Sequence, residues 1–177
     1  MSRYARITRI LAIAGVSGFV AFAGVYAAGA RINTTKSIPL GLYWITDEQV
    51  NKNSYVIFCP PADPVFLEAK KRGYITTGFC DGELGYMMKK VLAAKGDSVS
   101  FEHEGVRVNG ELLPLTARAT TDKHGREMPT PQPEVQVLND DELLVMSDVN
   151  PKSFDSRYFG VVNRKQIKSV ITPVFNW

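Results

Sequence analysis

Two unlike parts of the chain meet at residues 33–41, which read NTTKSIPLG. A long apolar stretch precedes these residues, and short apolar runs separated by turn residues follow them. Pro39 and Gly41 stand at the start of an apolar run that extends to Thr46, so Ser37 lies at the entrance of a predicted strand. A serine is chemically inert unless a base takes its proton. The central question is therefore which residue acts on Ser37.

The apolar stretch, residues 10–30, contains no charged residue and is flanked by Arg9 and Arg31. At a helical rise of about 1.5 Å per residue it covers about 30 Å, the thickness of the hydrocarbon core of a bilayer. Basic residues before such a segment stay on the cytoplasmic side. The sequence thus predicts a cytoplasmic tail over 1–9, a transmembrane anchor over 10–30 and a periplasmic domain over 31–177. A cleaved signal peptide is the alternative, because small residues stand near the end of the stretch.

The charge distribution argues against a nucleic-acid partner. The chain has 21 basic and 18 acidic residues, and three of the basic ones are Arg3, Arg6 and Arg9 in the predicted tail. Removing these three from 21 leaves 18 basic residues against 18 acidic ones. Beyond the tail the chain is neutral and long enough for one compact domain, so no nucleic-acid-binding footprint is expected.

Short apolar runs bounded by Gly, Pro and Asn predict that this domain is mainly β. The predicted strands cover 38–46, 54–59, 85–94, 98–102, 106–108, 112–113, 142–146 and 166–175. One helix is predicted over 64–72, with Pro64 in its first turn and Gly73 after its end. Residues 114–134 are expected to be an exposed proline-rich excursion, and residues 147–158 a polar loop.

The two cysteines, Cys59 and Cys80, both follow the apolar stretch and lie on the predicted periplasmic side. In an oxidising compartment such a pair forms one disulfide, whereas two buried free thiols are the alternative. The sequence does not choose between them. Neither His103 nor His124 fits a zinc motif and there is no Cys-x-x-Cys, so neither a metal nor any other cofactor is expected.

With no histidine well placed to act as a base, a lysine is the remaining candidate. In the predicted strand 85–94, Lys89 shares one face with Met87 and Val91, and Lys90 lies on the other face. An apolar site favours the neutral amine, which is the form that accepts a proton. Alternation alone does not choose between the two lysines, and a structural lysine with a buried stem is the alternative.

Three blocks of sequence resemble those of the bacterial type I signal peptidases. Residues 35–39, TKSIP, resemble their nucleophile block. Residues 89–97, KKVLAAKGD, are similar to their lysine block, and residues 153–160, SFDSRYFG, to their C-terminal block. The run SIPLGLY over 37–43 is most similar to the TraF branch, the conjugative-transfer peptidases that mature pilin precursors. Two departures from the general family pattern, Ser-Ile-Pro and the run SDVNPK over 147–152, favour a dedicated substrate.

The resemblance implies a role for each matching residue. Ser37 would attack the scissile carbonyl, and Lys89 would take its proton and return one to the leaving amine. Thr35 matches a hydroxyl residue that helps to form the oxyanion hole. Ser153 matches the hydroxyl that orients the lysine.

Two charged residues of the C-terminal block also match the family. Asp155 matches an aspartate implicated in activity in the TraF branch, and we count it with the catalytic candidates. Arg157 matches the basic residue paired with it near the site. A plain surface ion pair is the alternative for these two.

The sequence therefore predicts a signal-peptidase-like β domain behind one transmembrane helix, held in the inner membrane with the catalytic domain in the periplasm. The predicted function is a Ser/Lys endopeptidase that processes a pilin precursor for conjugative transfer, releasing either a linear or a cyclised product. The expected partners are the pilin precursor, membrane lipid and other conjugative transfer proteins. The alternatives are a general type I signal peptidase and a non-catalytic, membrane-anchored assembly subunit.

Overall fold

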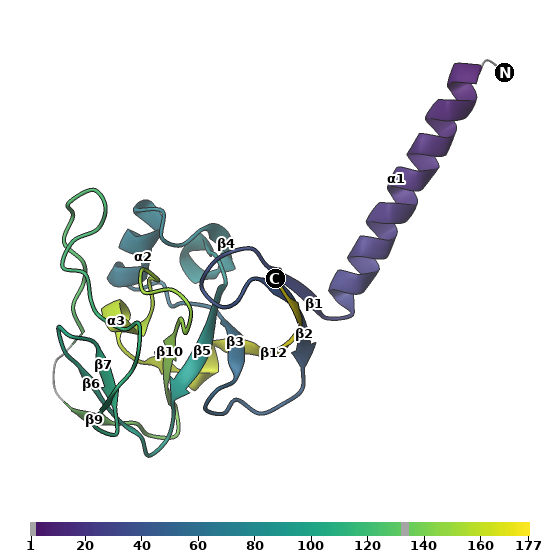
Figure 1. The fold of residues 1–177 in the computed structure, drawn as a ribbon. Coiled ribbons are helices and arrows are strands. Elements are labelled where there is room, and N and C mark those ends of the chain that lie inside the picture. Colours follow the sequence, from purple (N-terminus) through teal and green to yellow (C-terminus); the bar gives the residue numbers. More distant parts are fainter. Residues whose placement is uncertain (1–2, 132–134) are drawn as a thin grey trace.

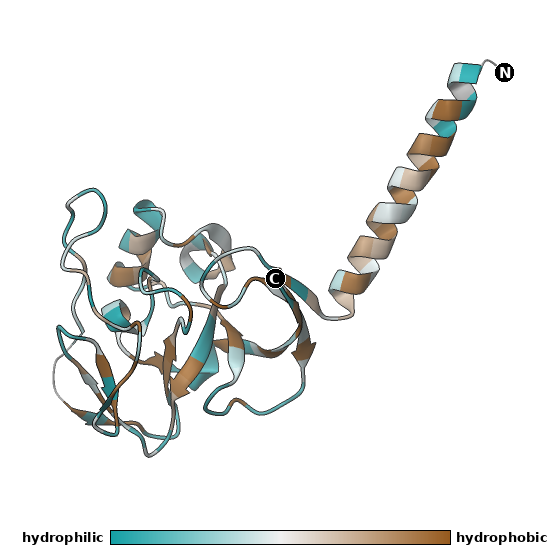
Figure 2. Cartoon of the chain, viewed as in Figure 1, coloured by the Kyte–Doolittle hydropathy of each residue, from teal (hydrophilic) through white to brown (hydrophobic). Residues whose placement is uncertain are grey.

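Helix α1 (Arg3–Ala27) projects away from the domain that the rest of the chain forms (Figure 1). The computed structural model describes residues 3–131 and 135–177. Residues Arg6–Ala27 of this helix are long and apolar enough to cross a membrane, and none of that segment is buried against the domain. Apolar and weakly polar residues dominate the helix in Figure 2.

The helix differs from the predicted segment 10–30 at its C-terminal end. It ends at Ala27, and Gly29 adopts a φ of +115°, a conformation that residues with a side chain rarely adopt. Ala30 then begins β1 (Ala30–Asn33) and pairs with Trp44. The last residue of the predicted segment thus belongs to the sheet, because a glycine turns the backbone out of the helix.

The larger of two antiparallel sheets has the strand order β1-β2-β12-β3-β5-β10-β11. Its further members are β2 (Gly41–Thr46), β3 (Tyr55–Phe58), β5 (Met87–Ala93), β10 (Glu142–Met146), β11 (Val162–Asn163) and β12 (Ile167–Asn176). The smaller sheet has the order β8-β7-β6-β9 and comprises β6 (Ser98–Phe101), β7 (Val106–Val108), β8 (Glu111–Leu112) and β9 (Gln136–Val137). The prediction of a mainly β domain behind an N-terminal apolar helix is confirmed.

The remaining elements are short. They are α2 (Pro64–Lys71), β4 (Thr77–Cys80), α3 (Ser156–Phe159) and the 3₁₀ turns η1 (Asp81–Glu83) and η2 (Arg164–Gln166). Sequence patterning did not predict β1, β4, β9 or β11, although β7 and β8, which are of similar length, overlap the predicted strands 106–108 and 112–113. The main core lies between the larger sheet and helices α2 and α3, and includes Phe58, Phe66, Leu84 and Tyr158.

The prediction of a polar loop over 147–158 is wrong at its C-terminal end, and much of the segment is buried. It contains the start of α3, and Ser147, Ser153 and Asp155 are all buried. Asp155 accepts from the Ser147 amide and Ser153 accepts from the Lys89 amine, so these polar groups are satisfied inside the domain and their polarity does not indicate the surface.

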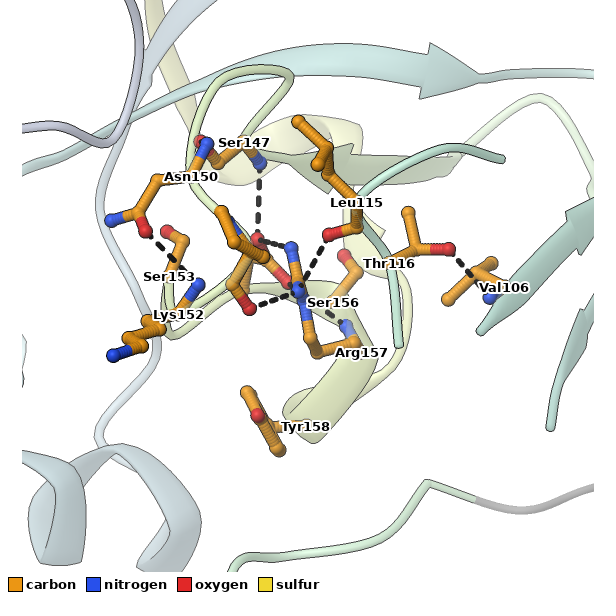
Figure 3. A network of polar contacts seen from close by, with 12 residues as sticks. Val106, Leu115, Thr116, Ser147, Asn150, Lys152, Ser153, Ser156, Arg157 and Tyr158 are labelled. Carbon is orange, nitrogen blue, oxygen red and sulfur yellow. Dashed lines mark hydrogen bonds and ion pairs between the residues drawn. The ribbon is translucent and has the colours of Figure 1, made fainter. Parts of the chain in front are cut away.

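The predicted excursion contains no helix or strand over 114–131, and residues 132–134 lie outside the described residues. It is not exposed throughout. Thr116 is 1% exposed, and its hydroxyl accepts a hydrogen bond from the Val106 amide and donates one to the Leu113 carbonyl. Figure 3 shows the contact with Val106. The beginning of the excursion is therefore attached to the smaller sheet.

A disulfide joins Cys59, which follows β3, to Cys80 at the end of β4. The two cysteines are 21 positions apart in the sequence and enclose α2. This crosslink connects the larger sheet to the segment that enters β5.

Removing the disulfide should destabilise the domain. Closing a loop of this length lowers the entropy of the unfolded chain, which stabilises the folded state by about 3 kcal/mol. We expect dithiothreitol to lower the free energy of unfolding of the full-length protein in detergent by about this amount, measured by urea denaturation followed by circular dichroism. The matched control is the Cys59→Ser, Cys80→Ser double variant, in which dithiothreitol should have no effect. An unchanged midpoint for the wild type under reductant would contradict the prediction.

Candidate active site

Ser37 lies in the turn between β1 and β2, and the side chain of Asn33 organises this turn. Asn33 is 2% exposed. Its amide nitrogen donates hydrogen bonds to the carbonyls of Thr35, Ile38 and Pro39 over 2.7, 2.9 and 3.0 Å. Its amide oxygen accepts from the backbone nitrogen and the hydroxyl of Thr35 over 3.2 and 3.0 Å. One buried side chain thus holds the backbone on both sides of Ser37.

The hydroxyls of Thr35 and Ser37 lie 2.7 Å apart. Because the amide oxygen of Asn33 can only accept, the Thr35 proton points to it whenever that hydrogen bond is made. The Ser37 hydroxyl is then the donor to Thr35. The direction in which the Thr35 hydroxyl donates therefore fixes the direction in which the Ser37 hydroxyl donates.

The residue after Ser37 anchors the turn in the domain. Ile38 is fully buried in a small cluster with Tyr43, Ile57 and Ile171. The hydroxyl of Tyr43 also donates to the Pro39 carbonyl over 2.7 Å. The turn that carries Ser37 is therefore packed into the larger sheet. Ser37 itself is only half-buried.

Lys89 lies on β5 between β3 and β10 and is 3% exposed. Its amine donates to the hydroxyl of Ser153 over 2.5 Å. Burial lowers the pKa of Lys89 from 10.5 to about 8, while the nearby Asp155 carboxylate acts to raise this pKa and Arg157 acts to lower it. At a pKa of about 8, about one tenth of Lys89 is neutral at pH 7, far more than for a free lysine.

Lys90 lies on the opposite face of β5 and has different surroundings. Its amine forms an ion pair with Asp148 over 3.0 Å and lies 5.4 Å from the centre of the Tyr55 ring. Asp148 also accepts a hydrogen bond from the Tyr55 hydroxyl over 3.0 Å. The pleat of the strand buries Lys89 against a neutral hydroxyl and gives Lys90 a directly paired counter-ion, which is the distinction that alternation alone did not make.

Behind Ser153 lies a fully buried ion pair between Asp155 and Arg157, both 0% exposed. The guanidinium donates to both carboxylate oxygens, over 2.8 and 3.0 Å, and Asp155 also accepts from the Ser147 amide over 3.0 Å. A third nitrogen of Arg157 donates to the carbonyls of Leu115, Ala117 and Pro151. Figure 3 shows Arg157 at the centre of this network. The pair joins the loop that carries Ser153 to the start of the excursion.

One cleft of about 930 Å³ brings most of the candidates together. Thr35, Ser37, Lys89 and Ser153 all line it, although they come from three separate parts of the sequence. Asp155 and Arg157 lie behind its wall and are not among the lining residues. The cleft thus holds a hydroxyl and a buried amine of lowered pKa, the two groups that base-assisted acyl transfer requires.

Residues 2–176 match the family model described as signal peptidase, peptidase S26. The chain belongs to this family. Two plasmid transfer proteins TraF from Escherichia coli are similar to it, one with 58% identity and 97% of each chain covered, the other with 54% identity over the full length of both. A signal peptidase I crystal structure from Enterococcus faecalis is 14% identical, with a TM-score of 0.39, over 72% of this chain and 100% of the other. The resemblance inferred from the three sequence blocks is thus confirmed by the family match and the relatives.

Two residues that organise the S26 site were not singled out from the sequence. For Asn33 the available signal is the tendency of an Asn side chain to bond the backbone two residues on. The hydroxyl of Ser147 accepts from the amides of Val149 and Asn150 and donates to the Lys36 carbonyl over 3.4 Å. Ser147 therefore connects the loop that carries Ser153 to the turn that carries Ser37.

Asn33→Ala should loosen the turn around Ser37. The substitution removes the side-chain donor of the Thr35 and Ile38 carbonyls, at a cost of about 1–3 kcal/mol for the buried Ile38 carbonyl if nothing replaces the bond, whereas the Pro39 carbonyl keeps the Tyr43 hydroxyl. We expect faster hydrogen exchange over residues 33–39 and a lower melting temperature, measured by mass spectrometry and calorimetry. Asn51→Ala is the matched control, because Asn51 is exposed and donates one side-chain bond to Gln49. Equal exchange in the wild type and in Asn33→Ala would contradict the role given to Asn33.

Proposed function

We propose that this chain is a membrane-anchored serine endopeptidase that processes a pilin precursor for conjugative transfer by means of a Ser37/Lys89 dyad. The observation that carries the proposal is the burial of Lys89, with a pKa of about 8, in the same cleft as Ser37. Family membership supports a peptidase reaction, and relatives named as plasmid transfer proteins support the conjugative context.

In the proposed acylation, neutral Lys89 accepts the proton of Ser37 while the Ser37 oxygen bonds to the scissile carbonyl carbon. The tetrahedral intermediate then breaks its C–N bond, and Lys89 returns the proton to the leaving amine. The product of this step is an acyl-enzyme on Ser37. In the resting structure, Ser37 bonds to Thr35 and Lys89 to Ser153, so substrate binding has to redirect the Ser37 hydroxyl towards the amine.

Thr35 is the proposed oxyanion donor. For this role its proton has to turn from the Asn33 amide oxygen to the carbonyl oxygen of the substrate. Loss of one such donor typically lowers the rate by about 100- to 1000-fold. Asn33 keeps the Thr35 hydroxyl beside Ser37 until the substrate arrives.

Ser153 and the buried ion pair are proposed to position Lys89. The Ser153 hydroxyl accepts from the amine and directs it into the cleft. Asp155 and Arg157 hold the loop from behind, and their opposite charges act on the pKa of Lys89 in opposite directions. Asp155 is therefore proposed as a positioning residue that acts through Ser153 and Lys89.

The acyl-enzyme has two possible acceptors. Attack by water gives a linear product, and attack by the amino terminus of the substrate gives a ring. Similarity to the TraF branch favours ring closure for this chain. The two outcomes differ by one water in mass.

Helix α1 is proposed to anchor the enzyme in the inner membrane, with the domain in the periplasm. Ten residue-to-residue steps (37 − 27) lead from the end of the helix at Ala27 to Ser37, so the chain permits at most about 36 Å between them. Such a tether suits a membrane-embedded precursor whose processing site lies near the lipid surface. Membrane lipid and other conjugative transfer proteins are the further proposed partners.

The dyad is tested by pilin maturation in cells that carry Ser37→Ala or Lys89→Ala. We expect either change to reduce processing on the order of 10⁴-fold or more, because removing one member of a catalytic unit costs about as much rate as removing all of them. Lys90→Ala is the matched control, because it removes the neighbouring lysine on the opposite face of β5. This variant should retain processing. The measurement is the intact mass of the pilin. An immunoblot checks that each enzyme variant is present at the level of the wild type.

Normal maturation in both dyad variants would contradict the proposed enzyme and favour the inert assembly subunit. Broad rescue of cells depleted of their housekeeping signal peptidase would instead favour the general enzyme. Finding only the linear mass would contradict ring closure.

The pH dependence follows from the lowered pKa of Lys89. The base is active when neutral, so kcat/KM should rise with pH, with half of the maximum near pH 8. Below this pH the rate should fall about tenfold per unit. The measurement is cleavage of a peptide from the pilin processing site between about pH 6 and about pH 10. A rate independent of pH across this range would contradict Lys89 as the base.

A further inference from the structure

The cleft that contains Ser37 and Lys89 is also strongly basic. Four further cationic residues line it, namely Lys36, Arg118, Lys123 and Lys152. This concentration is local, because the sequence beyond the N-terminal tail has equal numbers of basic and acidic residues. Such a surface raises the local concentration of anionic ligands.

The described lining of the cleft includes one acidic residue, Asp122, and its carboxylate is already engaged. It accepts hydrogen bonds from the Tyr74 hydroxyl, from the guanidinium of Arg126 and from the backbone nitrogens of His124 and Arg126. Asp122 is therefore not a counter-ion for the four cations. Within the described part of the chain the four cations form no ion pair, so their charge is available to an anionic ligand.

Arg118 is held in place by its neighbours. The carbonyl of Ala117 accepts from Arg157 over 3.4 Å, and the amide of Ala119 donates to the Tyr158 hydroxyl over 3.2 Å. Residues 156–159 form α3, which directly follows the loop that carries Ser153. The backbone at Arg118 is thus attached to the same scaffold that positions Lys89.

One guanidinium nitrogen of Arg118, Nη1, is buried and has no hydrogen-bond partner within the described part of the chain. Buried donors of a charged group are costly when they are unpaired, so a residue that lines the cleft has a guanidinium that lacks an acceptor. The planar guanidinium matches a carboxylate, which can accept two parallel hydrogen bonds from it.

We propose that Arg118, supported by the charges of Lys36, Lys123 and Lys152, forms a carboxylate-binding subsite, and that the substrate carries a carboxylate close to its scissile bond. This carboxylate is either an Asp or Glu side chain or a free carboxyl terminus of the substrate. The inference rests on the proposed peptidase function, because Ser37 and Lys89 line the same cleft. That shared cleft favours a peptide over an anionic lipid headgroup as the ligand.

The test uses the full-length protein in detergent and quenched fluorescent peptides that span the processing site of the co-encoded pilin precursor. Each acidic residue is replaced by its amide, and the carboxyl terminus is either free or amidated, which separates the two sources of the carboxylate. The quantity compared is the ratio of kcat/KM for the charged and the neutral peptide within each variant.

We expect the wild type to prefer the charged peptide by about 10-fold or more, with the effect in KM. Arg118→Gln should reduce this ratio to near one, and Arg118→Lys should give an intermediate ratio because it keeps the charge and loses the paired donors. Lys168→Gln is the matched control, since it removes one exposed charge from β12 outside the cleft and should leave the ratio unchanged. Melting temperatures check that the variants fold.

Binding of the same peptides to Ser37→Ala, measured by fluorescence anisotropy, separates this inference from the proposed function. A preference for the charged peptide that Arg118→Gln removes supports the subsite even if no peptide is cleaved. Equal binding of charged and neutral peptides overturns it. An Arg118-dependent response to phosphatidylglycerol vesicles over phosphatidylcholine, without any peptide preference, would also overturn it in favour of a lipid headgroup.

Discussion

The buried ion pair between Asp155 and Arg157 is the interaction on which the rest of the site depends. Both side chains are fully buried, so each requires the other to compensate for the loss of hydration. Through Ser147, Leu115, Ala117 and Pro151 the pair connects the loop before α3 to the start of the excursion. When the cost of desolvation is counted, the Asp155–Arg157 ion pair contributes little to the free energy of folding. Its effect is on geometry, because it holds the loop that carries Ser153.

Lys89 lies on the other side of the Ser153 hydroxyl and is subject to competing effects. Removal of water disfavours the ammonium form of Lys89 and lowers its pKa. The Asp155 carboxylate behind the wall of the cleft favours the ammonium form and partly raises the pKa again. Arg157 keeps that carboxylate paired. The resulting pKa of about 8 lies between that of a free lysine and that of a fully isolated buried amine. This intermediate value suits a group that has to accept a proton and return it.

Much of the fold followed from local patterns in the sequence. Strands β3, β5, β10 and β12 all lie within predicted segments or within one residue of them, because apolar residues bounded by Gly and Pro define strands of this length. The short strands β9 and β11 were missed because two residues have no period. The predicted polar loop over 147–158 contains the start of α3 and several buried residues, and a pattern of polar residues does not reveal that they are hydrogen-bonded inside the domain.

By itself, the sequence determined the apolar helix, the mainly β class and the membership of the signal peptidase family. These properties depend on residue types and on short spacings along the chain. Only the tertiary structure decided that Lys89, and not Lys90, enters the cleft, that Cys59 joins Cys80, and that Asn33 holds the turn around Ser37. Each of these depends on which segments distant in sequence pack together, and burial and hydrogen-bond geometry exist only after the chain has folded.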